Sequence, residues 1–115
     1  MADTQQMDES EFHKRVDAIL AAIESAFDEV EVDIDAELNG GILALTFENG
    51  SKVIVNRQTP NREIWVAAKS GGFHFSWAEK DGVTAWYDTR SAERLERLLS
   101  RVISMQSESV IAITF

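Results

Sequence analysis

The sequence predicts an α+β fold, a two-layer α/β sandwich in which an antiparallel sheet of about six strands carries the N-terminal and C-terminal helices on one face. Apolar residues recur at helical spacing near both ends of the chain, and between the ends they alternate at strand spacing. Short turn sequences separate the alternating runs, so neighbouring strands must pair antiparallel. The other face of the sheet is then left to solvent or a partner.

The first helix is predicted from an apolar stripe with an acidic stripe beside it. Ser10 is the expected N-cap, and residues 1–9 are expected to be flexible. The apolar stripe consists of Phe12, Val16, Ile19, Leu20, Ile23 and Phe27. At about 100° per residue, the neighbouring stripe consists of His13, Asp17, Glu24 and Asp28.

The middle of the chain is expected to form strands. Strict alternation over residues 31–38 predicts a first strand with its apolar residues inward and its carboxylates outward. Further strands are expected at residues 42–47, 52–57, 63–69, 73–77 and 83–87. The inward residues of the second to fourth strands are expected to be Leu43, Leu45, Phe47, Val53, Val55, Ile64 and Val66.

A final helix is predicted to begin near Ser91, because apolar residues again recur at helical spacing from Leu95 to Ile103. The apolar tail at residues 110–115 must be buried, either as an extra strand or in a groove beside a helix. Residues 1–115 are expected to form a single domain.

Composition narrows the possible partners. The net charge of −9 argues against nucleic acid and anionic membranes, and it favours cations or basic protein surfaces. No stretch approaches the roughly 18 apolar residues that span a membrane, and no signal-peptide pattern is present, so a cytoplasmic protein is expected. The absence of cysteine excludes disulfides and thiolate chemistry.

The acids are concentrated in the first part of the chain. Residues 1–48 carry 13 acidic and 2 basic residues, whereas residues 49–115 carry 7 and 9. We define the acidic surface as Asp17, Glu24, Asp28, Glu29, Glu31, Asp33, Asp35 and Glu37. Its oxygens suit hard cations, which this open layout would hold weakly, and His13 could add a nitrogen ligand. Alternatively, these carboxylates only keep an edge strand soluble, and His13 is an ordinary surface histidine.

Trp65 is expected on the open face of the sheet, among small and polar neighbours, with His74 on the same face. An exposed tryptophan in such a setting is typical of an interface hot spot, but it could equally lie flat across small residues without a partner. No nucleophile elbow, P-loop or dinucleotide motif is present, so the sequence predicts no enzymatic activity.

Several motifs together resemble the frataxin family, most closely its bacterial members. They are Asn39-Gly40-Gly41, Thr46-Phe47-Glu48-Asn49-Gly50-Ser51-Lys52, and Val55-Asn56-Arg57-Gln58-Thr59-Pro60-Asn61 followed by Ile64-Trp65. Ser10-Glu11-Phe12-His13 and Gly71-Gly72-Phe73-His74-Phe75 add to the resemblance, which covers roughly residues 10–105. It implies the same α/β sandwich that the periodicity predicts.

The resemblance also implies a function in iron–sulfur cluster assembly. Frataxins bind iron weakly, as Fe2+ or Fe3+. The resemblance implies that the acidic surface binds iron here, with His13 as an added ligand. They bind the cysteine desulfurase and the scaffold protein. The partner-contacting residues of the family correspond here to Asn56, Gln58 and Trp65. The implied protein is a non-enzymatic regulator of that complex and a donor of iron to it, monomeric unless iron drives oligomers. The alternative is a metal-independent interaction module whose acidic surface docks on the basic desulfurase.

Overall fold

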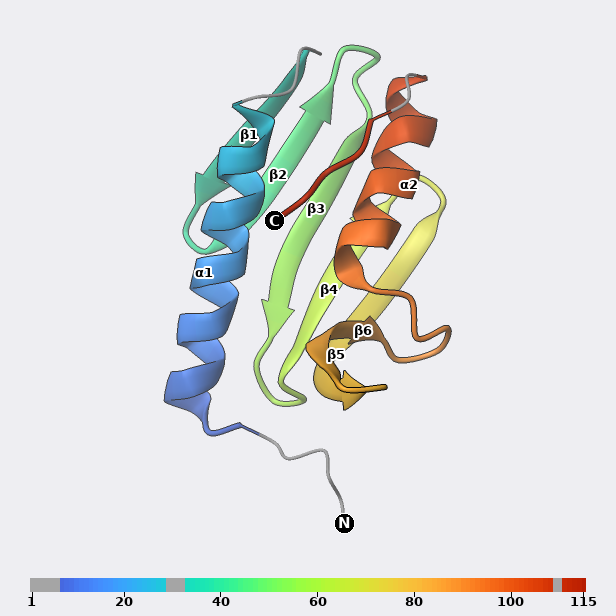
Figure 1. Cartoon of the computed structure of the whole chain (residues 1–115). Helices are drawn as coiled ribbons and strands as arrows, with labels where there is room; N and C mark the ends of the chain where they lie inside the picture. Colours follow the sequence, from blue (N-terminus) through green and yellow to red (C-terminus); the bar gives the residue numbers. More distant parts are fainter. Residues whose placement is uncertain (1–6, 29–32, 109–110) are drawn as a thin grey trace.

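Six antiparallel strands form one sheet in the part of the chain that the computed structural model describes, which is residues 7–28, 33–108 and 111–115. The strands lie side by side in chain order. The elements are α1 (Glu9–Phe27), β1 (Ile34–Asn39), β2 (Ile42–Phe47), β3 (Lys52–Gln58), β4 (Glu63–Ala68), β5 (Gly71–Lys80), β6 (Val83–Asp88) and α2 (Leu95–Ser107). Both helices cover the same face of the sheet (Figure 1), so the predicted two-layer sandwich is confirmed. Neither described helix is long and apolar enough to cross a membrane.

The core lies between the helices and the sheet. The apolar stripe of α1 is buried at Phe12, Val16, Leu20, Ile23 and Phe27. Strands β2 to β5 bury Leu43, Leu45, Phe47, Val53, Val55, Ile64, Val66 and Phe75. Helix α2 adds Leu95, Leu98, Leu99, Val102 and Ile103. The inward residues predicted for β2, β3 and β4 are therefore confirmed, and removal of this apolar area from water is the main force that holds the layers together.

The start of α1 differs from the prediction. Its N-cap is Asp8, whose Oδ1 accepts the backbone N–H of Glu11 at 2.8 Å, so Ser10 lies inside the helix and the predicted N-cap was wrong. Aspartate caps as well as serine does, and its charge also complements the positive end of the helix dipole. Among the residues predicted to be flexible, Met7 accepts a hydrogen bond from Arg62 Nε at 3.1 Å, and residues 1–6 lie outside the described range.

The start of α2 also differs, because residues 89–94 connect β6 to the helix, which begins at Leu95 rather than near Ser91. The buried carboxylate of Asp88 accepts the backbone N–H groups of Arg90 and Ser91, at 2.7 and 3.2 Å. Ala92 then takes a left-handed conformation with φ of 63°. The side chain of Asp88 thus competes with the helix for these amides.

Strand β5 is longer than predicted, and Glu31 and Val32 of the predicted first strand lie outside the described residues.

The C-terminal tail, residues 111–115, runs between the two helices (Figure 1). Ile111 and Ile113 are buried there. Ser104 Oγ donates to the carbonyl of Ile111 and accepts its N–H, both at 2.9 Å, and Ser100 Oγ makes the same pair of bonds to Ile113, at 3.4 and 2.8 Å. Of the two predicted locations, the groove beside a helix is therefore correct for residues 111–115.

The buried side chain of Gln106 connects the end of α2 to two turns of the sheet. Its Oε1 accepts the backbone N–H of Lys69 at 2.8 Å, and its Nε2 donates to Ser51 Oγ at 3.0 Å and to the Lys52 carbonyl at 3.3 Å. Its own carbonyl accepts from Asn49 Nδ2 at 2.7 Å. One amide thus satisfies polar groups on both the β2–β3 and β4–β5 turns.

We predict that Gln106→Ala lowers the free energy of unfolding by about 1–3 kcal/mol, because the N–H of Lys69 loses its partner. Met105→Ala is the matched control, since Met105 is the neighbouring residue on α2 and is 59% exposed. Urea denaturation of both variants measures the difference. Equal stability of the two variants would contradict the role given to Gln106.

Candidate functional site

The acidic surface is spread over α1 and β1. Glu24 lies half-buried on α1, and Asp28 is exposed at its C-cap. Asp33 directly precedes β1, and Asp35 and Glu37 are exposed on it, alternating with the half-buried Ile34 and Ala36. Glu29 and Glu31 lie outside the described residues. The structure therefore places the described acids along one edge of the molecule, because β1 is an edge strand and α1 packs against it.

These acids do not form a closed ligand cage in the described part of the chain. No three histidine or acidic side chains there lie close enough together to hold one metal ion. Asp33, Asp35 and Glu37 also take part in no ion pair among the described residues. An open set of unpaired carboxylates attracts cations through its field and not through a preformed geometry.

Two arginines at α2, the N-cap Arg94 and Arg101 within the helix, have acidic partners close by. Arg101 donates to Glu93 at 2.8 Å, and this hydrogen bond raises the pKa of the guanidinium. Arg94 pairs with Glu96, also at 2.8 Å. The excess negative charge is therefore left on the side of α1 and β1.

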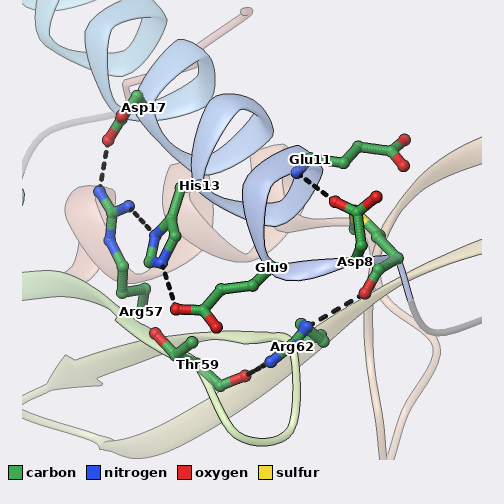
Figure 2. Close-up of polar contacts among 9 residues, drawn as sticks. Asp8, Glu9, Glu11, His13, Asp17, Arg57, Thr59 and Arg62 are labelled. Atoms are coloured by element: carbon green, nitrogen blue, oxygen red, sulfur yellow. Dashed lines mark hydrogen bonds and ion pairs between the residues drawn. The ribbon is translucent and has the colours of Figure 1, made fainter.

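His13 and Asp17, both predicted as metal ligands, instead contact Arg57 from β3 (Figure 2). Arg57 Nη1 lies 2.8 Å from His13 Nδ1, and Arg57 Nη2 lies 2.5 Å from Asp17 Oδ1. The other ring nitrogen of His13, Nε2, lies 3.5 Å from Glu9 Oε2. We call Glu9, His13, Asp17 and Arg57 the arginine clamp. It joins the first half of α1 to the sheet.

Arg57 was missed as a functional residue, although the sequence carries a signal for it. Strand alternation that turns Val53 and Val55 inward also turns Arg57 inward, and a cation on the helix-covered face needs an acidic partner. Glycine at position 41 makes room for it. A Cβ there would lie 3.1 Å from Arg57 Nη2, and the φ of 80° at Gly41 also favours glycine.

On the opposite face of the sheet, Trp65 is 39% exposed and stacks on His74. The ring centroids are 4.3 Å apart and the planes differ by 6°. Glu63 Oε1 accepts from Trp65 Nε1 at 2.9 Å and lies 3.7 Å from His74 Nδ1. The predicted outward orientation of Trp65 is confirmed, and the stack with His74 is a feature that alternation alone does not reveal.

The three predicted partner residues lie together on this face. Asn56 pairs with Trp65 across β3 and β4, and Gln58 pairs with Glu63 one step along. The side-chain oxygens of Asn56 and Gln58 accept the backbone N–H groups of Arg57 and Asn61, at 2.8 and 2.9 Å. Among the described residues their NH2 groups make no hydrogen bond, so these ends can meet another molecule. We define the open-face patch as Ile42, Ala44, Ile54, Asn56, Gln58, Trp65, Ala67 and His74.

A family model described as the frataxin-like domain matches residues 5–109. The chain belongs to the frataxin-like family. Two curated relatives are each named iron–sulfur cluster assembly protein CyaY. The protein from Tolumonas auensis is 48% identical over 101 residues, covering 88% of this chain and 93% of the relative. The protein from Pseudomonas aeruginosa is 50% identical over 95 residues, covering 83% of this chain and 86% of the relative.

Solved structures place this frataxin-like chain in the same fold. Frataxin from Psychromonas ingrahamii matches with a TM-score of 0.82 at 35% identity, covering 95% of this chain and 100% of that one. Trimeric frataxin from Saccharomyces cerevisiae, complexed with ferrous iron, matches with a TM-score of 0.63 at 22% identity, covering 95% and 94%. The yeast protein supports the fold alone. The resemblance inferred from the sequence motifs is thus confirmed at the level of the family.

We predict that Trp65→Ala lowers the free energy of unfolding by less than about 1.5 kcal/mol, because the indole packs mainly on one neighbouring ring. Ile64→Ala is the matched control, since Ile64 precedes Trp65 and is fully buried, and it should cost about 2–5 kcal/mol. Chemical denaturation of both variants gives the comparison. A loss at Trp65 as large as at Ile64 would mean that the indole belongs to the core.

Proposed function

We propose that this frataxin-like protein is a non-enzymatic, iron-binding regulator of iron–sulfur cluster assembly that acts on the complex of cysteine desulfurase and scaffold protein. The observation that carries the metal part is the acidic edge at Asp33, Asp35 and Glu37 beside the end of α1, which forms no ion pair with any other described residue. The names of the curated relatives support the place in cluster assembly. A cytoplasmic location is part of the same proposal.

The acidic edge suits iron for a chemical reason. Carboxylate oxygens are hard ligands, and they bind Fe3+ and Fe2+ without needing cysteine. Ligands on separate elements and without a cage give weak binding, so iron would exchange readily. Readily exchanged iron fits a protein that senses the metal or hands it to the assembly complex better than one that stores it.

The open-face patch suits a protein partner. It combines the exposed side chains of Ile42 and Trp65, 40% and 39% exposed, with amide donors at Asn56 and Gln58. An aromatic anchor beside hydrogen-bond donors is typical of an interface hot spot. We assign this face to the desulfurase–scaffold complex and the acidic edge to iron.

We predict that Fe2+ added without oxygen perturbs the backbone amide NMR signals of residues 24–28 and 33–37. Asp35→Asn with Glu37→Gln should weaken this binding roughly tenfold, because two charges are lost from the edge. The matched control is Glu79→Gln with Asp81→Asn, which removes the same charge at the β5–β6 hairpin on the opposite edge of the sheet. Absence of any perturbation at millimolar Fe2+ would refute the metal part.

The arginine clamp favours a second candidate, a metal-independent interaction module. Part of the acidic surface already holds a cation of the protein itself, and no three-ligand group occurs among the described residues. In this reading the acidic edge binds a basic surface of the desulfurase, and iron is incidental.

The second candidate predicts an effect of charge reversal in metal-free buffer. Asp35→Lys with Glu37→Lys should weaken desulfurase binding by about tenfold or more, because opposite charges become like charges at the interface. Glu79→Lys with Asp81→Lys changes the net charge equally at the opposite edge and should have little effect. Calorimetry with the isolated desulfurase measures both. Unchanged affinity for the first pair would eliminate this candidate.

A further inference from the structure

The Arg57 guanidinium lies between a histidine and an aspartate that would otherwise be available to a metal ion (Figure 2). We propose that Arg57 is a specificity-determining residue, an internal cation that excludes metal ions from His13 and Asp17 and confines them to the acids of residues 24–28 and 33–37. This inference rests on the proposed function, since it states which part of the acidic surface that metal binding uses.

The hydrogen-bond roles in the clamp leave His13 without a free lone pair. A guanidinium has only donors, so His13 Nδ1 accepts from Arg57 across the 2.8 Å contact. The proton of the neutral ring is then on Nε2, which faces Glu9 Oε2 at 3.5 Å. A metal ligand must present a nitrogen lone pair, and neither ring nitrogen does so in this arrangement.

Asp17 is engaged by the same guanidinium through one of its two carboxylate oxygens. Its side chain is 66% exposed, but its Oδ1 carries the Arg57 contact at 2.5 Å. A cation approaching this carboxylate would meet the guanidinium charge at close range. Repulsion between like charges only a few ångströms apart is strong enough to shift an affinity by about tenfold.

The clamp also resists opening, because Arg57 is held from several sides. Its side chain is only 16% exposed, and Gly41 of the β1–β2 turn lies directly against it. A metal ion that displaced it would leave a largely buried guanidinium without its acceptors, which costs free energy. Asp33, Asp35 and Glu37 present no such competitor among the described residues.

The test uses Zn2+ as the probe, because it binds both imidazole and carboxylate and leaves NMR signals sharp. The sequence has two histidines, so the His13 imidazole signal is followed directly and His74 reports non-specific binding. In the wild-type protein, Zn2+ should perturb residues 24–28 and 33–37 before His13 responds. In Arg57→Met, His13 should respond at a Zn2+ concentration about tenfold lower than in the wild type. Arg57→Lys, which keeps the charge, should behave like the wild type.

Two outcomes would overturn the inference. One is a His13 response at the same Zn2+ concentration in the wild type and in Arg57→Met, and the other is no response in either. If Arg57→Met does not fold, His13→Gln provides the test. Loss of the imidazole should leave the Zn2+ affinity at residues 24–28 and 33–37 within about twofold of wild type. A larger loss of affinity would contradict the exclusion of metal ions from His13. A failed Fe2+ titration with a gained His13 response would reject the proposed iron function and retain the role of Arg57.

Discussion

The helices cover only one face of the sheet, so strand alternation determines which residues face the helices and which are exposed to a binding partner. On β3, Val55 and Arg57 face the helices, whereas Asn56 and Gln58 face outward. Consecutive residues of one strand therefore serve the arginine clamp and the open-face patch in turn. A shift of the register by one residue would exchange the two sets and destroy both surfaces together. The apolar core thus fixes the position of polar residues that contribute nothing to it.

In the described part of the chain, each helix is attached to the sheet by a long polar side chain with specific hydrogen bonds, in addition to apolar packing. Arg57 reaches from β3 to the first half of α1, and Gln106 reaches from the end of α2 to two turns of the sheet. Apolar contacts supply most of the stability but tolerate sliding, whereas hydrogen bonds between specific atoms do not. These two side chains therefore add to what defines how far along the sheet each helix lies.

Much of this architecture could be predicted from the sequence, because it depends on periodicities of a few residues. The inward and outward residues of β2 to β4, including Trp65, follow from alternation. The two helix starts were predicted incorrectly because several side chains could accept the same backbone N–H groups. In the structure Asp8 accepts the N–H of Glu11, and Asp88 accepts the N–H of Arg90. The clamp depends on contacts between residues 40 and 44 positions apart, which no local pattern specifies.

The tail illustrates a limit on how an extended chain can follow a helix. Ser104 and Ser100 are four helical residues apart, a rise of about 6.0 Å, whereas Ile111 and Ile113 are two extended residues apart, about 6.6–6.8 Å. The two repeat distances are close but unequal, and the bonds become uneven along the tail. Ser100 Oγ lies 3.4 Å from the Ile113 carbonyl oxygen and 2.8 Å from the Ile113 nitrogen, against 2.9 Å for both bonds at Ser104. One more step would bring Phe115 opposite Glu96 with a still larger offset. A serine ladder on a helix can therefore hold only a short stretch of extended backbone.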